Sequence, residues 1–134
     1  MNLCFAQIAE KLMAGYSFEK ITAIILRIGI GLTLIYASMN AIMAPQDWIG
    51  YVPQWVGVVI SREWFLTVHS VAELGIGLGL LANLYTPVMS LLAFFDFSAI
   101  LIFYGIDAVT FRDFGLAFAA LALFFESLPR KERL

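Results

Sequence analysis

Three charged side chains stand inside apolar stretches of the chain, where charges are rare. They are Arg27, Glu73 and Asp96, and His69 precedes Glu73 by one helical turn. A charge in the middle of a membrane helix costs about 2.5–3.5 kcal/mol on insertion scales, so it normally faces the protein interior and has a partner. Two carboxylates and one guanidinium leave one acid unpaired, which favours a centre that binds a ligand or relays protons. The alternative is a buried Arg27–Glu73 ion pair that only fixes the arrangement of the helices.

His69 and Cys4 limit the redox and metal chemistry open to the chain. His69 can hydrogen-bond Glu73 or pass protons, or it can be a solvated residue at the membrane interface. Bis-histidine haem ligation is excluded because the chain has one histidine. One cysteine, Cys4, excludes an internal disulfide, a CxxC pair and a zinc cluster, and leaves its own role open. We expect no metal site and no cofactor held firmly by this chain alone.

Composition places these residues in a membrane protein. Of 134 residues 62% are apolar and only 13% are charged, against about 45–50% and about 25% in soluble domains. The net charge of −2 offers no basic surface for nucleic acid. The low polar content also excludes a disordered chain.

Long uncharged or nearly uncharged runs predict four transmembrane helices, because a hydrocarbon core of about 30 Å needs about 20 residues. They cover approximately residues 21–44, 64–84, 87–105 and 111–128. Pro45 ends the first and Pro87 begins the third. Apolar residues that run continuously rather than alternate exclude a barrel. We expect an all-α fold in one membrane domain, residues 1–134, which is an integral membrane four-helix bundle with an N-terminal amphipathic interfacial helix.

The flanking segments indicate how this bundle is oriented. Residues 1–18 show helical spacing of apolar residues and predict an amphipathic helix on the inner surface. Residues 45–63 form an extracytoplasmic loop rich in aromatics, interpreted as an interfacial belt or as a lid. Positive residues gather on the side of both termini, which should therefore be cytoplasmic: Lys11, Lys20, Arg27, Arg130, Lys131 and Arg133.

Glycines mark the faces on which these helices are expected to pack. Gly75 and Gly79 form a GxxxG pair, which is a common packing signal of low specificity in membranes. Gly31 shares a helical stripe with Arg27, and Gly77 shares one with Glu73, so close helix approach is expected there too. The hairpin of the second and third helices should place Glu73 and Asp96 at the same depth.

Four segments together resemble the DoxX family of small four-helix membrane proteins over about residues 24–125. The segments are the Arg27 region, Pro45 to Pro53 with Trp48, Glu73 to Leu80, and Phe111 to Leu116. The resemblance implies a membrane component of an oxidoreductase system, with quinone as a possible cofactor. Its matching polar residues are Arg27, Glu73, Arg112 and Asp113. Asn40 stands where the family often has a lysine.

Three classes of function remain open. The first is an accessory or quinone-facing subunit of a membrane oxidoreductase, with a membrane or peripheral redox protein as partner. The second is a small proton-coupled transporter, which would need a homo-oligomer to enclose a path, and the third is a structural or assembly protein. No catalytic motif is present, since the glycines after Glu73 lie within a span with no strand before them. We expect localisation in a bacterial or archaeal plasma (inner) membrane, in contact with the lipid bilayer and without nucleic acid.

Overall fold

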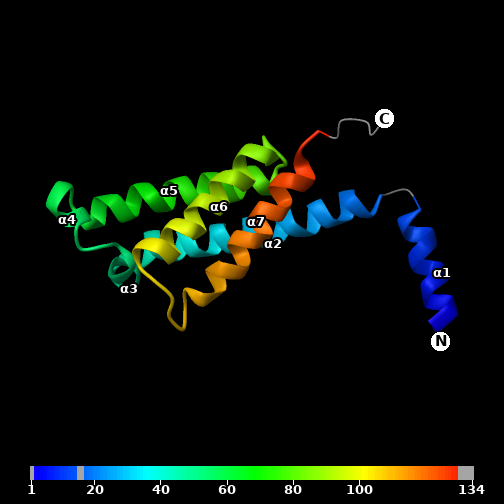
Figure 1. The fold of residues 1–134 in the computed structure, drawn as a ribbon, viewed down its shortest axis with the longest axis horizontal. Helices are drawn as coiled ribbons and strands as arrows, with labels where there is room; N and C mark the ends of the chain where they lie inside the picture. Colours follow the sequence, from blue (N-terminus) through cyan, green and yellow to red (C-terminus); the bar gives the residue numbers. More distant parts are fainter. Residues whose placement is uncertain (1, 15–16, 130–134) are drawn as a thin grey trace.

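The computed structural model describes residues 2–14 and 17–129, and helices without any strand make up the ordered elements of this part (Figure 1). In chain order they are α1 (Asn2–Met13), α2 (Phe18–Met43), α3 (Pro45–Trp48), the 3-10 helix η1 (Ile49–Tyr51), α4 (Val56–Val59), α5 (Arg62–Leu81), α6 (Thr86–Phe103) and α7 (Phe111–Ser127). The predicted all-helical class is confirmed.

Three of these helices, α2, α5 and α6, are long and apolar enough to cross a membrane. The fourth predicted span falls on α7, which has 17 residues. At about 1.5 Å per residue this helix is about 26 Å long, slightly less than the hydrocarbon thickness of about 30 Å. The crossing of the membrane by all four helices therefore stays a prediction.

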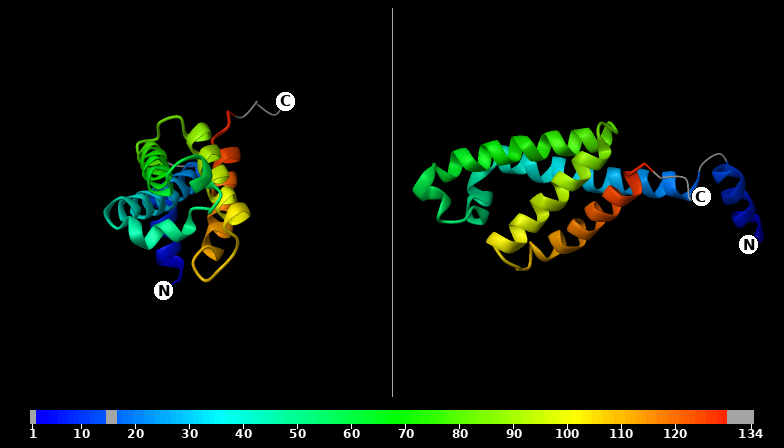
Figure 2. Two further views of the ribbon diagram at one scale, coloured as in Figure 1. Left: turned by 90° about the vertical axis from the view of Figure 1, so that its left-hand side faces the viewer. Right: turned by 45° about the horizontal axis from the view of Figure 1, so that its top comes forward.

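The long helices pack as two pairs, α2 with α5 and α6 with α7. The pairs run at an angle to each other, and contacts between α5 and α6 and between α2 and α7 join them (Figure 2). The main core lies where the four helices meet, and Leu80, Ala93, Ala120 and Leu123 are completely buried in it. The start of α2 and the end of α7 lie at the same end of the helices (Figure 1).

The closest helix contact is the crossing of α2 and α5 at Gly31 and Gly77. A Cβ atom on Gly77 would lie 2.9 Å from the carbonyl oxygen of Gly31, and one on Gly31 would lie 3.0 Å from that of Gly77. The GxxxG pair, Gly75 and Gly79, was expected to pack against a neighbouring helix with both glycines, and only one of them does so. Gly79 packs against Met89, but a Cβ on Gly75 would meet nothing within 4 Å, so Gly75 faces away from the neighbouring helices.

A second apolar cluster, Ala41, Val52, Val56 and Leu66, holds the outer connection between α2 and α5. Arg62, at the start of α5, donates from Nη2 to the carbonyl oxygens of Ile49 and Val52, both at 2.7 Å. The loop is thereby tied to the first turn of α5. It lies beside the polar residues described next.

Candidate functional site

Three side chains that can carry protons or bind cations meet between α5 and α6. The Nε2 atom of His69 lies 3.4 Å from Glu73 Oε1 and 3.2 Å from Asp96 Oδ1. The two carboxylate side chains are each only 10% exposed and the imidazole is 32% exposed. We call His69, Glu73 and Asp96 the triad.

Helix geometry explains how the triad forms. His69 and Glu73 are at i and i+4, so they lie on one face of α5. A short turn joins α5 to α6, with Asn83 and Tyr85 in the left-handed region at φ 55° and 47°. This turn reverses the chain tightly, and α6 then carries Asp96 to the level of the imidazole.

Arg27 does not join the triad, contrary to the predicted Arg27–Glu73 partnership. Its Nε donates to the carbonyl oxygen of Leu80 at 2.9 Å and its Nη2 to that of Leu81 at 3.2 Å. These carbonyls belong to the last turn of α5, which has no following helical turn, and the Leu80 oxygen also accepts the N–H of Asn83 at 3.2 Å. Arg27 therefore binds the C-terminal end of α5, about two helical turns from Glu73.

The other guanidinium groups of the helical core are also directed at main-chain carbonyls. Arg62 binds the outer loop, and Arg112 Nε donates to the carbonyl oxygen of Val109 at 3.0 Å. Within residues 2–14 and 17–129, the triad acids thus have no Lys or Arg as an ion-pair partner. The nearest basic group is His69, a member of the triad.

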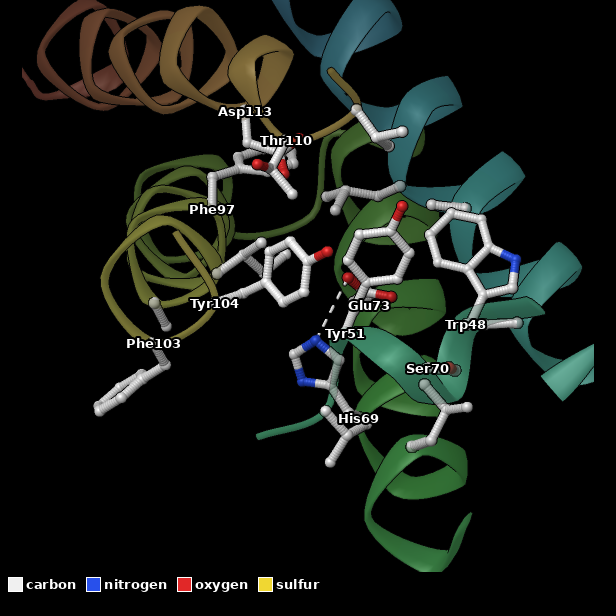
Figure 3. Close-up of a pocket in the computed structure, with 18 of the residues that line it drawn as sticks. Trp48, Tyr51, His69, Ser70, Glu73, Phe97, Phe103, Tyr104, Thr110 and Asp113 are labelled. Atoms are coloured by element: carbon white, nitrogen blue, oxygen red, sulfur yellow. Dashed lines mark ion pairs between the residues drawn. The ribbon is translucent and has the colours of Figure 1, made fainter. Parts of the chain in front are cut away.

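A cavity of about 940 Å³ opens beside the triad, toward the outer loop (Figure 3). His69 and Glu73 line it, together with many apolar and aromatic side chains. The aromatic ones are Tyr36, Trp48, Tyr51, Trp55, Phe65, Phe97, Phe103 and Tyr104. Its size is at the upper end of the range of about 300–1,000 Å³ typical of small-molecule pockets, and a mostly apolar wall with a few polar groups is also typical.

Aromatic contacts between two separate segments line the outer side of this cavity. Tyr51 and Tyr104 have ring centroids 4.7 Å apart, and Trp55 and Phe103 have centroids 5.9 Å apart. The contacts join the outer loop of residues 45–60 to the end of α6. Both connections therefore contribute to this side of the cavity, and the choice between an interfacial belt and a lid stays a prediction.

Asp107 stabilises the turn that connects α6 to α7. Its Oδ1 accepts hydrogen bonds from the main-chain N–H groups of Val109 and Thr110, at 2.7 and 2.8 Å. These donors hold the pKa of the Asp107 carboxyl below its usual value. Tyr104 donates its hydroxyl to Asp107 Oδ2 at 3.0 Å, which raises the pKa of Tyr104. The turn places Thr110 and Tyr104 at the cavity wall.

The residues of the predicted outer motif divide between cavity and surface. Trp48, Arg112 and Asp113 line the cavity. Asn40 does not line it, because its side chain donates back to the carbonyl oxygen of Tyr36 at 2.8 Å. Ser70 has a buried hydroxyl with no hydrogen-bond partner in the described part of the chain, and it lines the cavity too.

Ser70, Tyr51 and Tyr104 were missed as site residues by sequence reasoning. Ser70 carried a usable signal, since it lies at i−3 from Glu73 and therefore on the same helical face. The tyrosines carried none, because each looks like an ordinary interfacial aromatic until the two connections are brought together.

The fold and site define an α-helical membrane protein with a buried acidic and histidine centre beside an aromatic cavity. The family model named DoxX matches residues 22–105, more than half of the chain, and the protein belongs to the DoxX family. Comparisons with curated proteins and with solved structures give no significant match.

Proposed function

We propose that this DoxX-family protein is the quinone-facing subunit of a membrane oxidoreductase complex and that the cavity holds the quinone headgroup. The observation that carries the proposal is the pairing of an apolar, aromatic cavity of about 940 Å³ with His69 and Glu73 in its wall. A quinone headgroup is a flat ring with polar oxygens. Aromatic side chains suit the ring, and the two polar side chains suit the oxygens.

The residues around the cavity can be assigned separate roles in proton transfer and hydrogen bonding. Interconversion of a quinone and its quinol moves two electrons and two protons. His69 and Glu73 face the cavity and can accept or return protons, and Asp96 lies behind His69 as a further acceptor. The electrons must pass to or from a redox group on a partner protein, which this proposal requires. The unpartnered hydroxyl of Ser70 is a spare hydrogen-bond donor for the ligand.

We further propose that α2, α5, α6 and α7 cross the plasma membrane as a four-helix bundle with both termini in the cytoplasm. The excess of Lys and Arg near the termini supports this orientation. It places the cavity in the outer half of the membrane. We also propose that α1 lies on the inner surface, supported by its exposed apolar residues Leu3, Phe5, Ile8 and Leu12.

Co-purification of quinone tests the headgroup site. The full chain is purified from its membranes in mild detergent, and extracted quinones are quantified by mass spectrometry per mole of protein. Ala99→Phe adds a ring at a cavity-lining position, whereas Ala122→Phe makes the same change on an exposed face of α7. We expect quinone with the wild type and with Ala122→Phe, and at least a fivefold loss with Ala99→Phe.

Two results would count against the proposal. Equal quinone in both variants would mean that the lipid is carried nonspecifically by the surface. Absence of quinone from the wild type, together with proton flux when the protein alone is placed in liposomes, would favour the transporter class instead.

A further inference from the structure

We infer that the triad is a binding site for one divalent transition-metal ion, with Zn²⁺ as the best-fitting probe and Mn²⁺ or Fe²⁺ as alternatives. Each of His69, Glu73 and Asp96 offers one ligand atom, and these three atoms lie within 4.8 Å of one another. One imidazole nitrogen and two carboxylate oxygens form a ligand set that borderline divalent metals accept. The inference does not depend on quinone binding, and it describes a different state of the triad: a bound ion would occupy the atoms that accept protons in the metal-free protein.

The separations between the ligand atoms fit a bound cation. Zinc bonds of about 2.0–2.1 Å at tetrahedral angles place neighbouring ligand atoms about 3.3 Å apart. The two nitrogen–oxygen distances in the triad are 3.4 and 3.2 Å. The third edge, between the two carboxylate oxygens, lies within the 4.8 Å that encloses all three ligand atoms.

Both contacts meet at the same nitrogen of His69, and this favours a metal over hydrogen bonding. An N–H group donates well only near a straight line, at angles above about 150°. A single Nε2–H therefore cannot serve Glu73 and Asp96 equally. A metal ion on the Nε2 lone pair can bind both carboxylates at once.

The charge and the burial of the triad also favour a bound cation. With both acids ionised, the triad keeps a net negative charge whatever the state of His69, and no Arg or Lys of the described residues pairs with it. A divalent cation neutralises two carboxylates, which removes the cost of burying their charge. In addition, Asp96 Oδ2 is buried and has no hydrogen-bond partner in the described part of the chain. The Asp96 side chain as a whole is only 10% exposed. Such an oxygen is available as a ligand.

This inference departs from the expectation that the chain has no metal site. That expectation was based on cysteine and histidine counts, which detect thiolate-rich and bis-histidine sites. A site with one histidine and two carboxylates from two helices leaves no such spacing in the sequence. The sequence places Glu73 and Asp96 at one depth, and the packing of α5 against α6 brings their oxygens to the same nitrogen of His69.

Direct titration of the purified full chain with Zn²⁺ tests the site. The protein carries a histidine-free affinity tag and Cys4→Ser, which remove competing ligands, and chelator strips any metal before calorimetry. We expect one Zn²⁺ per chain, with affinity lowered at least tenfold by His69→Ala, Glu73→Gln or Asp96→Asn. Glu63→Gln is the matched control, since Glu63 is an exposed acid on the same helix.

A second measurement guards against variants that do not fold. Co²⁺ titrated into the wild type should give a visible absorption band characteristic of low coordination number, and equimolar Zn²⁺ should abolish it. Absence of stoichiometric Zn²⁺ and Co²⁺ binding by the folded wild type overturns the inference, as does binding that survives all three substitutions. Quinone content is measured on the metal-free protein. The quinone proposal can therefore fail while the metal site is confirmed, and the reverse also holds.

Discussion

Two glycines on one helix are predicted to respond in opposite directions to the same substitution. Gly77→Ala adds a methyl group at the crossing of α2 and α5, whereas Gly75→Ala adds it where nothing lies within 4 Å. The crossing matters to function because α5 carries His69 and Glu73. The pair therefore tests the packing that positions the triad.

The magnitude follows from the contacts. The new Cβ at position 77 would lie 2.9 Å from the Gly31 carbonyl oxygen and 2.9 Å from Ile35 Cγ1. The second contact is about 0.6 Å shorter than the carbon–carbon optimum that begins near 3.5 Å, and the first is also shorter than real Cβ contacts. Ile35 can rotate, but the carbonyl is helix backbone, so α2 must move. Overpacking of this kind costs about 1–3 kcal/mol, partly offset by the gain of about 0.5–1 kcal/mol from replacing a helical glycine.

We therefore expect Gly77→Ala to lower the free energy of unfolding by about 1 kcal/mol, between limits of about 0 and about 2.5 kcal/mol. Gly75→Ala should be neutral or should raise it by up to about 1 kcal/mol. The assay is reversible unfolding in mixed micelles, with sodium dodecyl sulfate as denaturant and helix content as the signal. Equal destabilisation by the two variants would refute the assigned crossing, because Gly75 would then be packed as tightly as Gly77.

Three further substitutions separate structural roles from site roles. Arg62→Ala removes charged hydrogen bonds worth about 1.5–3 kcal/mol, so hydrogen exchange of residues 45–60 should accelerate. Unchanged exchange would contradict the role assigned to Arg62. The pKa of Asp107 is lowered in the folded chain, so its stabilisation of residues 104–110 is present above the unfolded pKa of about 3.9 and is lost as pH falls through the lower folded value. In Asp107→Asn, the hydrogen-exchange protection factors of these amides should no longer fall as the pH is lowered through that range. A fall that persists in the variant would exclude Asp107 as its source. Arg27→Ala should reduce stability by about 1–3 kcal/mol while leaving the Zn²⁺ affinity of the folded fraction unchanged. A matching loss of affinity would place Arg27 at the site after all.

All three members of the triad can be named from the sequence. His69 and Glu73 follow from their i, i+4 spacing, and Asp96 follows from the isolation of its charge in an apolar run. Arg27 was expected beside Glu73 instead, because residue types reveal charged partners but not the carbonyls in the last turn of a helix that can accept from a side chain. Arg27 found two such carbonyls on α5.

Packing details and the cavity were harder to predict. Gly31 and Gly77 were expected to allow close approach and do so, but the GxxxG motif overstated the part of Gly75. A sequence motif does not say which side of the helix has a neighbour. The cavity depends on Tyr51 and Tyr104 meeting across two connections, and no local pattern records a contact between loops so far apart in the chain.

The central claim, that the cavity holds a quinone headgroup, is tested most directly by photolabelling in native membranes. A quinone analogue with a photoreactive group on its ring is added, and the labelled residues are mapped by peptide mass spectrometry. We expect label on cavity-lining residues of the outer loop and of α5, such as Tyr51, His69 and Ser70, and its loss when excess unmodified quinone competes. Label that spreads over exposed faces such as Phe118 of α7, or that excess quinone does not displace, would contradict it.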